Sequence, residues 1–206
     1  GRLEGLDLVG KGVIAGIAVG SVVIAAADEE TLRRIIAAGN GGNQDADVLA
    51  AADFFTVEVW GLRGLVTFYV FFMIELETRR IEITGITPGP NEAWMMQIGR
   101  NLTDPVDGCL RDKRFVIMDR DGKFCNSFRE MLEDESVKCV QLPPRSPNLN
   151  PHLERFFGSL KSETLDRVIF FGEKMLRQAV HSYLDHYHRC RNHQGLENRL
   201  LEPGVE

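Results

Sequence analysis

The chain has 206 residues, of which 44% are hydrophobic, so it can bury the core of one ordinary domain with an appendage. Its formal net charge is −6, which argues against a polyanion-binding surface spread over the whole molecule. A nucleic-acid-binding role therefore requires local basic patches, or carboxylates that carry divalent cations. Four cysteines without C-x-x-C spacing indicate neither a disulfide framework nor a zinc ribbon, and a reducing cytoplasm is expected.

The N-terminal part of the chain differs in composition from the rest. Residues 12–27 are uncharged, but this stretch is shorter than the roughly 18 to 20 residues that a membrane-spanning helix needs. It is also rich in glycine and flanked by charges, so we predict a loosely structured leader and no membrane partner. The glycine cluster at 39–43 is a possible linker. We therefore divide the chain into a leader over 1–46 and a domain over 47–206.

From residue 47 onward, strand and helix signals alternate. Two β-branched and aromatic runs on either side of "GLRG" predict a β-hairpin. Asn91, after a "PGP" breaker, is a predicted N-cap of the first helix in this domain. The predicted elements are strands over 52–60, 65–76 and 80–87, a helix over 91–104, a strand over 114–119, a helix over 124–135 and a strand over 137–143.

The last helix has the clearest periodicity in the chain. Apolar residues recur at steps of three and four along one face, which predicts that this face packs on the core. The residues of this face are Leu176, Ala179, Val180, Tyr183, Leu184 and Tyr187.

Asp53 is a charged residue at the entry to an apolar strand. An isolated ionised carboxylate in such surroundings is costly, so it is usually paired, bound to a metal ion or placed at the end of the strand. An exposed aspartate at a strand edge is the simpler interpretation, and Asp53 alone does not decide between the two.

Asp119 stands where the predicted strand over 114–119 ends. The sequence Asp-Arg-Asp-Gly that begins there is favourable turn chemistry in itself, so a turn and a functional site are both open. A calcium loop of the EF-hand type would need an acidic residue two positions earlier, where Ile117 stands, and this alternative is excluded.

Glu154 lies in the first turn of a further predicted helix. A proline-rich loop precedes this helix, Asn150 is its predicted cap and Pro151 its first residue. The positive end of the helix dipole favours an ionised carboxylate at this position, which would keep it available to a metal ion. An acidic residue is also ordinary at a helix start, so both interpretations stay open.

Taken together, these three acids carry a specific likeness. The stretches "DFFTVEVW", "MDRDGKF" and "RSPNLNPHLERFFGSLKSE" resemble the catalytic core of the transposase and retroviral-integrase family, including the spacing between the second and third acids. "YHRCRNHQGL" resembles the tail of bacterial insertion-sequence transposases. The resemblance covers 47–203 and implies an α/β, ribonuclease H-like mixed sheet of five strands flanked by helices.

The resemblance also implies a reaction. Asp53, Asp119 and Glu154 would be catalytic and would bind two Mg²⁺ or Mn²⁺ ions, which prefer hard oxygen ligands such as carboxylates. Asp121 is the reserve for the second acid. The expected protein is a polynucleotidyl transferase of a mobile element that cleaves and joins DNA, with element ends and a target duplex as partners. It is expected to be a homo-oligomer in the bacterial cytoplasm, associated with the nucleoid.

Basic residues near the third acid are expected to contact DNA. Lys161 lies two helical turns after Glu154 on the same face, where the family has a DNA-contacting basic residue. Arg145 and Arg155 are further predicted phosphate contacts. Gly158 departs from the basic or larger residue of the relatives, and a glycine inside a helix costs roughly 1 kcal/mol relative to alanine.

Three other interpretations bear on this assignment. A zinc site is not favoured, because the C-terminal histidines and cysteine lack two tidy ligand pairs. A ribonuclease H-type nuclease would share the metal chemistry without strand transfer. An inactive DNA-binding remnant is also open, because nothing in 1–46 matches the family. The chain would then be a fragment, a fusion or an element product that has lost its specificity domain. The residues weighed for zinc are His181, His186, His188, Cys190 and His193.

Overall fold

The computed structural model describes residues 49–141, 151–191 and 200–201. The predicted leader with its linker, and the predicted DNA contact Arg145, lie outside the described residues, as do Asn150 and His193. The described elements, in chain order, are β1 (Leu49–Gly61), β2 (Gly64–Glu75), β3 (Ile81–Thr87), α2 (Glu92–Leu102), β4 (Phe115–Met118), α3 (Asn126–Asp134), β5 (Lys138–Gln141), α4 (Pro151–Glu163), η3 (Leu165–Arg167), β6 (Phe170–Phe171) and α5 (Gly172–Arg189).

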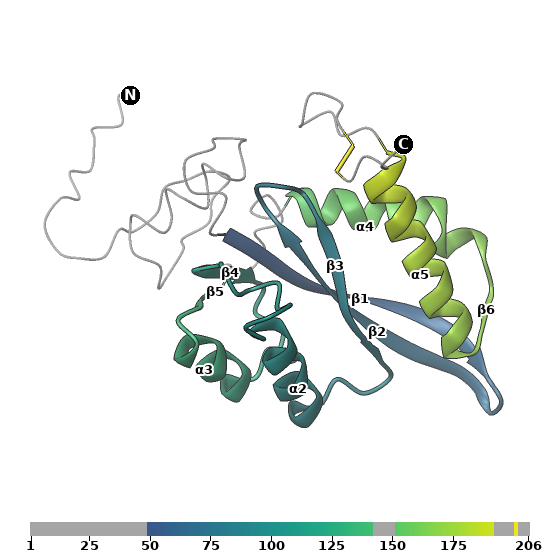
Figure 1. The fold of residues 1–206 in the computed structure, drawn as a ribbon. Coiled ribbons are helices and arrows are strands. Elements are labelled where there is room, and N and C mark those ends of the chain that lie inside the picture. The colour runs from purple at the N-terminus through teal and green to yellow at the C-terminus, as the bar shows by residue number, and fades with distance from the viewer. Residues whose placement is uncertain (1–48, 142–150, 192–199, 202–206) are drawn as a thin grey trace, which may run out of the picture.

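A mixed β-sheet forms the centre of the molecule (Figure 1). Its strand order is β3-β2-β1-β4-β5, and the short β6 pairs with the far part of β1. β1, β2 and β3 run antiparallel, whereas β4, β5 and β6 pair parallel to their neighbours. The sheet therefore confirms the predicted ribonuclease H-like α/β architecture, with β1 as its central strand.

The predicted hairpin of β1 and β2 is confirmed. The two strands pair from Ala50 opposite Glu75 to Gly61 opposite Gly64, so only two residues form the turn. Gly64 has a φ of 120°, a backbone conformation that a residue with a Cβ rarely adopts, and this explains the glycine at the end of the turn. The predicted cap of α2 is also present, because the Asn91 side chain accepts a hydrogen bond from the Trp94 amide at 2.9 Å.

Helices cover both faces of the sheet (Figure 1). One face packs against α4 and α5 and includes Leu49, Ala51 and Phe55 of β1. The other face packs against α2 and α3 and includes Ala50 and Ala52. Successive residues of a strand point to opposite faces, so β1 contributes side chains to both cores in strict alternation. The result is three layers, with the sheet between two helical layers.

The predicted packing face of the last helix is confirmed in α5. Leu176, Val180, Tyr183 and Tyr187 are buried in the same core as the α4 face of the sheet, and Ala179 and Leu184 pack against it. All six predicted residues therefore lie on the side of α5 that faces the sheet.

Two features of the fold differ from the sequence-based prediction. β1 begins at Leu49, several residues before the predicted start, because three small alanines fit between the two helical layers although alanine has low strand propensity. Asp53 is consequently inside the strand and not at its entry. The two-residue β6 and the 3₁₀ turn η3 were not predicted, since such short segments have no periodicity to read.

All four cysteines are free, as their spacing predicted. Within the described part of the chain, no helix has the length and apolar character needed to cross a bilayer; the uncharged stretch at 12–27 is outside that part.

Replacing Gly158 with alanine is expected to stabilise the protein by about 0.5–1 kcal/mol, because glycine is a poor helix former. Gly158 is exposed on α4, and an added Cβ would have no atom within 4 Å. Chemical denaturation of the Gly158→Ala variant measures the effect. Gly108→Ala is the matched control and should destabilise, because its Cβ would lie 2.5 Å from backbone atoms of Leu102 and Asp104. A loss of stability in Gly158→Ala would contradict the prediction.

Candidate active site

The sheet brings the first two predicted acids together. β1 and β4 pair in parallel, and the last pair in register is Ala52 with Met118. Asp53 and Asp119 are the next residues on the two strands. Because equivalent positions of parallel neighbours lie about 4.8 Å apart, the backbone positions of these aspartates are adjacent. Residues far apart in the chain thus meet at one point of the sheet.

Both aspartates belong to the sheet face that α4 covers. Ala51 and Phe55 flank Asp53 at steps of two and pack in the core beneath α4 and α5. Ile117, two positions before Asp119, packs in the same core. The alternation of a strand therefore directs Asp53 to this face, and it directs the continuation of β4 at Asp119 to the same side.

Asp53 is a strongly perturbed carboxylic acid. Its pKa is raised from 3.8 to about 6, mainly by burial and in addition by the negative charges of Asp119 and Asp121. A hydrogen bond from the Phe54 amide, 2.7 Å from Oδ1, and the positive charge of Lys123 act in the opposite direction. A bound cation would stabilise the ionised form of such a partly buried carboxylate with other carboxylates beside it.

Asp119 is held by a turn with its own hydrogen bonds. Its Oδ1 accepts a hydrogen bond from the Asp121 amide at 3.0 Å, and Asp121 Oδ1 accepts one from the Lys123 amide at 2.9 Å. Phe124 then closes the turn through its amide, which donates to the Asp121 carbonyl at 3.0 Å. The chain therefore turns between Asp119 and Phe124, through the side-chain hydrogen bond of Asp119 and the backbone turn from Asp121 to Phe124, and these bonds hold Asp119 at the end of β4.

An aromatic cluster anchors this turn from below. The buried Phe124 ring lies 5.4 Å from the ring of Phe54, 5.8 Å from that of Phe71 and 6.2 Å from that of Phe128. Phe54 is the immediate neighbour of Asp53 on β1. The two aspartates are therefore positioned by side chains that pack against one another on the opposite face of the sheet.

Lys123 is a residue at this site that the sequence analysis did not single out. Its ammonium group pairs with the Asp121 carboxylate and lies 5.2 Å from the centre of the Phe54 ring and 5.3 Å from that of Tyr69. Its charge also acts on the pKa of Asp53. Only its place within the turn, between Asp119 and the buried Phe124, could have indicated a role.

α4 crosses the sheet close to the two aspartates. The Phe156 ring lies 5.6 Å from the ring of Phe72, and Phe72 is the residue opposite Asp53 in the β1–β2 hairpin. Glu154 is two positions earlier, in the first turn of α4 as predicted. Its side chain lies outside the described residues, so its predicted role as a ligand remains a prediction.

The remaining predicted residues lie around this helix. Arg155 and Lys161 are exposed on α4. The zinc interpretation gains no support. The buried His188 has a structural role, because its Nε2 accepts a hydrogen bond from the Ile81 amide at 3.1 Å. Among the described side chains, no group of three or more histidines, cysteines or acids is arranged to hold a metal ion; Glu154 is outside that comparison.

Comparison with known proteins agrees with this arrangement. A family model described as "Integrase core domain" matches residues 135–200, which is about a third of the chain. No curated protein matches the sequence. The matched segment contains α4 and α5, the helices that cover the aspartate-bearing face.

Solved structures with a similar fold include retroviral integrase cores. The catalytic core domain of HTLV-2 integrase, solved with magnesium, has a TM-score of 0.54 at 9% identity, over 75% of this chain and 93% of that one. The catalytic core domain of BIV integrase has a TM-score of 0.51 at 12% identity, over 75% and 91%. The intasome of simian T-cell lymphotropic virus has a TM-score of 0.52 at 11% identity, over 78% and 58%. The predicted likeness to integrase catalytic cores is thereby confirmed.

Proposed function

We propose that this integrase-like catalytic core is a metal-dependent polynucleotidyl transferase of a mobile element, which cleaves a DNA strand and joins the new end to a target. The observation that carries the proposal is the convergence of Asp53 and Asp119 on neighbouring parallel strands, beneath the helix that bears Glu154. Integrase core folds host this chemistry, but a fold alone does not establish it, so the assignment depends on the carboxylates.

The donor set fits divalent cations of the magnesium type. Asp53 is a partly buried carboxylate whose pKa rises through desolvation and through the neighbouring charges of Asp119 and Asp121, and a bound cation would offset both effects. Carboxylate oxygens are the ligands that Mg²⁺ and Mn²⁺ prefer. We assign Asp53, Asp119 and Glu154 as the ligands of two ions. Bound ions of this kind supply charge stabilisation to a reacting phosphodiester and make a water or hydroxyl more acidic.

The chain's own residues would divide the remaining work. Asp53, rigid in the central strand, holds its place relative to Asp119 during the reaction, because the pairing of β1 with β4 fixes both backbones. The Asp121 amide orients the Asp119 carboxylate through its hydrogen bond to Oδ1. Exposed Lys161 and Arg155 on α4, with Arg145, would hold the phosphates of DNA next to the carboxylates.

Partners follow from the same assignment. The DNA partners would be the ends of the element and a target duplex. HTLV-2 integrase core has been solved in trimeric and dimeric forms, which supports the expectation that this chain also forms a homo-oligomer. A location near the bacterial nucleoid would place the protein at its substrate. The domain would comprise residues 47–206.

A strand-cleavage and joining assay tests the proposal. The substrate is a labelled DNA duplex offered with a supercoiled target plasmid in Mg²⁺ or Mn²⁺, and EDTA serves as the control. Shortened label together with label joined to the plasmid is the expected result. Cleavage confined to an RNA–DNA hybrid would instead identify a ribonuclease H-type nuclease. DNA binding without any product in either metal would identify a non-enzymatic remnant.

A further inference from the structure

The turn that follows β2 holds an unusual arginine. Arg79 has a φ of 63°, which is a strained backbone conformation for a residue with a Cβ. Among the side chains that the structure describes, its Nη1 is the buried nitrogen or oxygen atom that has no hydrogen-bond partner. A buried guanidinium nitrogen without a partner carries a desolvation cost that the fold alone does not offset.

The position of this turn is defined by several hydrogen bonds. The Arg79 amide donates to the Glu75 carbonyl at 2.9 Å, and the Ile81 amide donates to Nε2 of the buried His188 at 3.1 Å. His188 belongs to the last turn of α5, and its carbonyl accepts a hydrogen bond from Leu201 at 3.1 Å. The end of α5 therefore fixes the turn in place, and Arg79 occupies a built position and not a loose loop.

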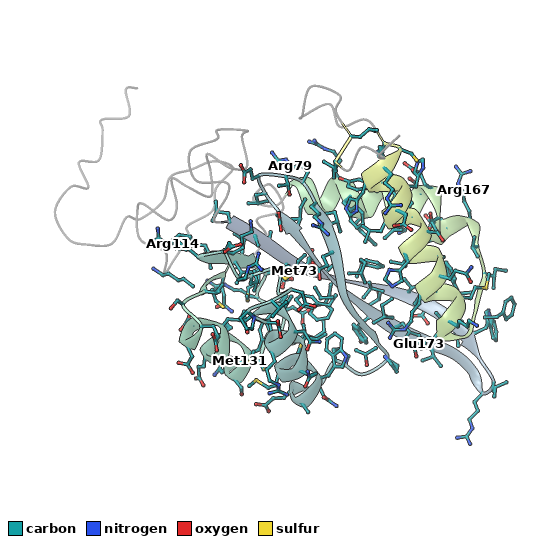
Figure 2. All side chains as sticks on the ribbon, viewed as in Figure 1. Met73, Arg79, Arg114, Met131, Arg167 and Glu173 are labelled. Atoms are coloured by element: carbon teal, nitrogen blue, oxygen red, sulfur yellow. The ribbon has the colours of Figure 1, made fainter. Side chains whose placement is uncertain are left out.

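Other arginines surround the same point, at the end of the sheet where Figure 2 labels Arg79. Burial raises the pKa of Tyr187, and the positive charges of Arg191, Arg79 and Arg155 each act in the opposite direction. The positive charge of Arg155 also lowers the pKa of Arg79, after the larger effect of burial. Mutual effects of this kind require proximity, so three cations from the β2–β3 turn, α4 and the end of α5 gather around one tyrosine.

One of these cations is already partly neutralised. Arg191 Nη1 lies 2.9 Å from Glu163 and 3.1 Å from the Tyr183 hydroxyl, and its guanidinium lies 5.8 Å from the centre of the Tyr187 ring. Arg79 and Arg155 have no such acid among the contacts of the described residues. Their positive charges therefore add to that of Arg191 at this corner of the molecule.

This corner adjoins the proposed carboxylate site. The Tyr187 ring packs 5.0 Å from the ring of Phe156, and Phe156 in turn packs on Phe72, the partner of Asp53 in the hairpin. Arg155 immediately precedes Phe156 on α4. An extended polyanion bound across the carboxylates and along the start of α4 would therefore pass close to Arg79.

We propose that Arg79, together with Arg155 beside Tyr187, forms a phosphate-binding site for the backbone of DNA held at the carboxylates. The identification of the anion as DNA rests on the proposed function. Guanidinium groups present several donors in a planar fork that matches the oxygens of a phosphate, and a phosphate would satisfy the unpartnered Nη1 of Arg79. The strained, half-buried arginine, with its buried Nη1, is then a group kept ready for its ligand.

Anisotropy of a fluorescein-labelled random-sequence duplex tests the site, with the full chain in EDTA so that no cleavage occurs. Arg79→Gln keeps a side chain with a Cβ at the strained backbone position while removing the charge. Its affinity should fall roughly tenfold, and the slope of log affinity against log salt should decrease by about 0.9, as for one lost phosphate contact. Arg63→Gln is the matched control, because Arg63 is exposed at the far tip of the hairpin.

Thermal unfolding separates a ligand site from a structural role. Removal of a half-buried charge with an unpartnered nitrogen should leave the melting temperature of Arg79→Gln unchanged or higher. A lower melting temperature with unchanged DNA affinity would assign Arg79 to the fold and overturn the site. If Arg79→Gln loses both, Arg79→Lys decides: restored stability with weak binding supports a forked phosphate contact, and restoration of both overturns it.

The source of the anion and the enzymatic proposal are tested separately. In one outcome, inorganic phosphate raises the melting temperature of the native chain but not that of Arg79→Gln, while the two proteins bind DNA equally well. This result would assign the site to small anions and overturn the DNA contact. Failure of cleavage in Mn²⁺ would count against the enzyme alone, because the binding experiment contains no metal.

Discussion

Asp119→Asn is expected to lower strand cleavage and joining by about a thousandfold or more, because Asp119 is a proposed metal ligand and the substitution removes its charge. The fold should be retained: the asparagine side chain keeps an oxygen that can accept the hydrogen bond from the Asp121 amide, which Asp119 Oδ1 accepts at 3.0 Å. DNA binding in EDTA should change little. The measurement is the initial rate of product formation in Mg²⁺, with unfolding curves to verify the fold.

Asp121→Asn is the matched control, because Asp121 lies in the same turn and interacts with the same carboxylate of Asp53. Its side chain pairs with Lys123, so we expect a modest loss of activity and not an abolished reaction. If Asp121→Asn were the inactive variant and Asp119→Asn the active one, Asp121 would be the second acid.

Asp53→Asn is expected to stabilise the metal-free protein at neutral pH. The folded-state pKa of about 6 exceeds the value of 3.8 for a free aspartate, so the folded state binds the proton more tightly than the unfolded state. Stability conferred by this proton is complete below pH 4 and is lost as the pH rises through 6. At pH 7 the ionised Asp53 destabilises the fold by up to about 3 kcal/mol, the free-energy equivalent of that pKa difference.

Urea denaturation at pH 4 and pH 7 in EDTA measures this effect. Asp53→Asn should gain stability at pH 7 and gain little at pH 4, where the native aspartate is protonated. Addition of Mg²⁺ at pH 7 should stabilise the native protein by mass action and leave Asp53→Asn nearly unchanged. If the variant were less stable than the native protein at pH 7 in EDTA, the ionised Asp53 would not destabilise the fold. If Mg²⁺ stabilised both proteins equally, Asp53 would not bind the ion.

Much of the fold was predictable because its elements carry strong local signals. Alternating β-branched and aromatic residues on both sides of a glycine turn specify the β1–β2 hairpin, and the three-and-four spacing from Leu176 to Tyr187 specifies the buried face of α5. The adjacency of Asp53 and Asp119 followed from family likeness and not from local pattern. Parallel pairing of β1 with β4 joins segments far apart in the chain, and no single-strand signal encodes it.

The features that sequence analysis missed arise from tertiary contacts. Three alanines extend β1 because the space between two helical layers is narrow, which overrides their low strand propensity. Lys123 lies near the aspartates because the turn after β4 directs its side chain toward them. Arg79 gives no sequence signal either, since its burial depends on α4 and α5 meeting the β2–β3 turn.

The central place of β1 has a consequence for how the protein fluctuates. Asp53 lies on β1, which pairs with β2 along nearly its whole length and also with β4 and β6. Residues of β1 are buried on both faces of the sheet. Segments tied down in this way open only when the entire domain opens, whereas helix ends and surface turns open by themselves. Local opening of the surface elements therefore leaves Asp53 in place. The helical layers can adjust to a long, bulky substrate while the position of Asp53 stays fixed.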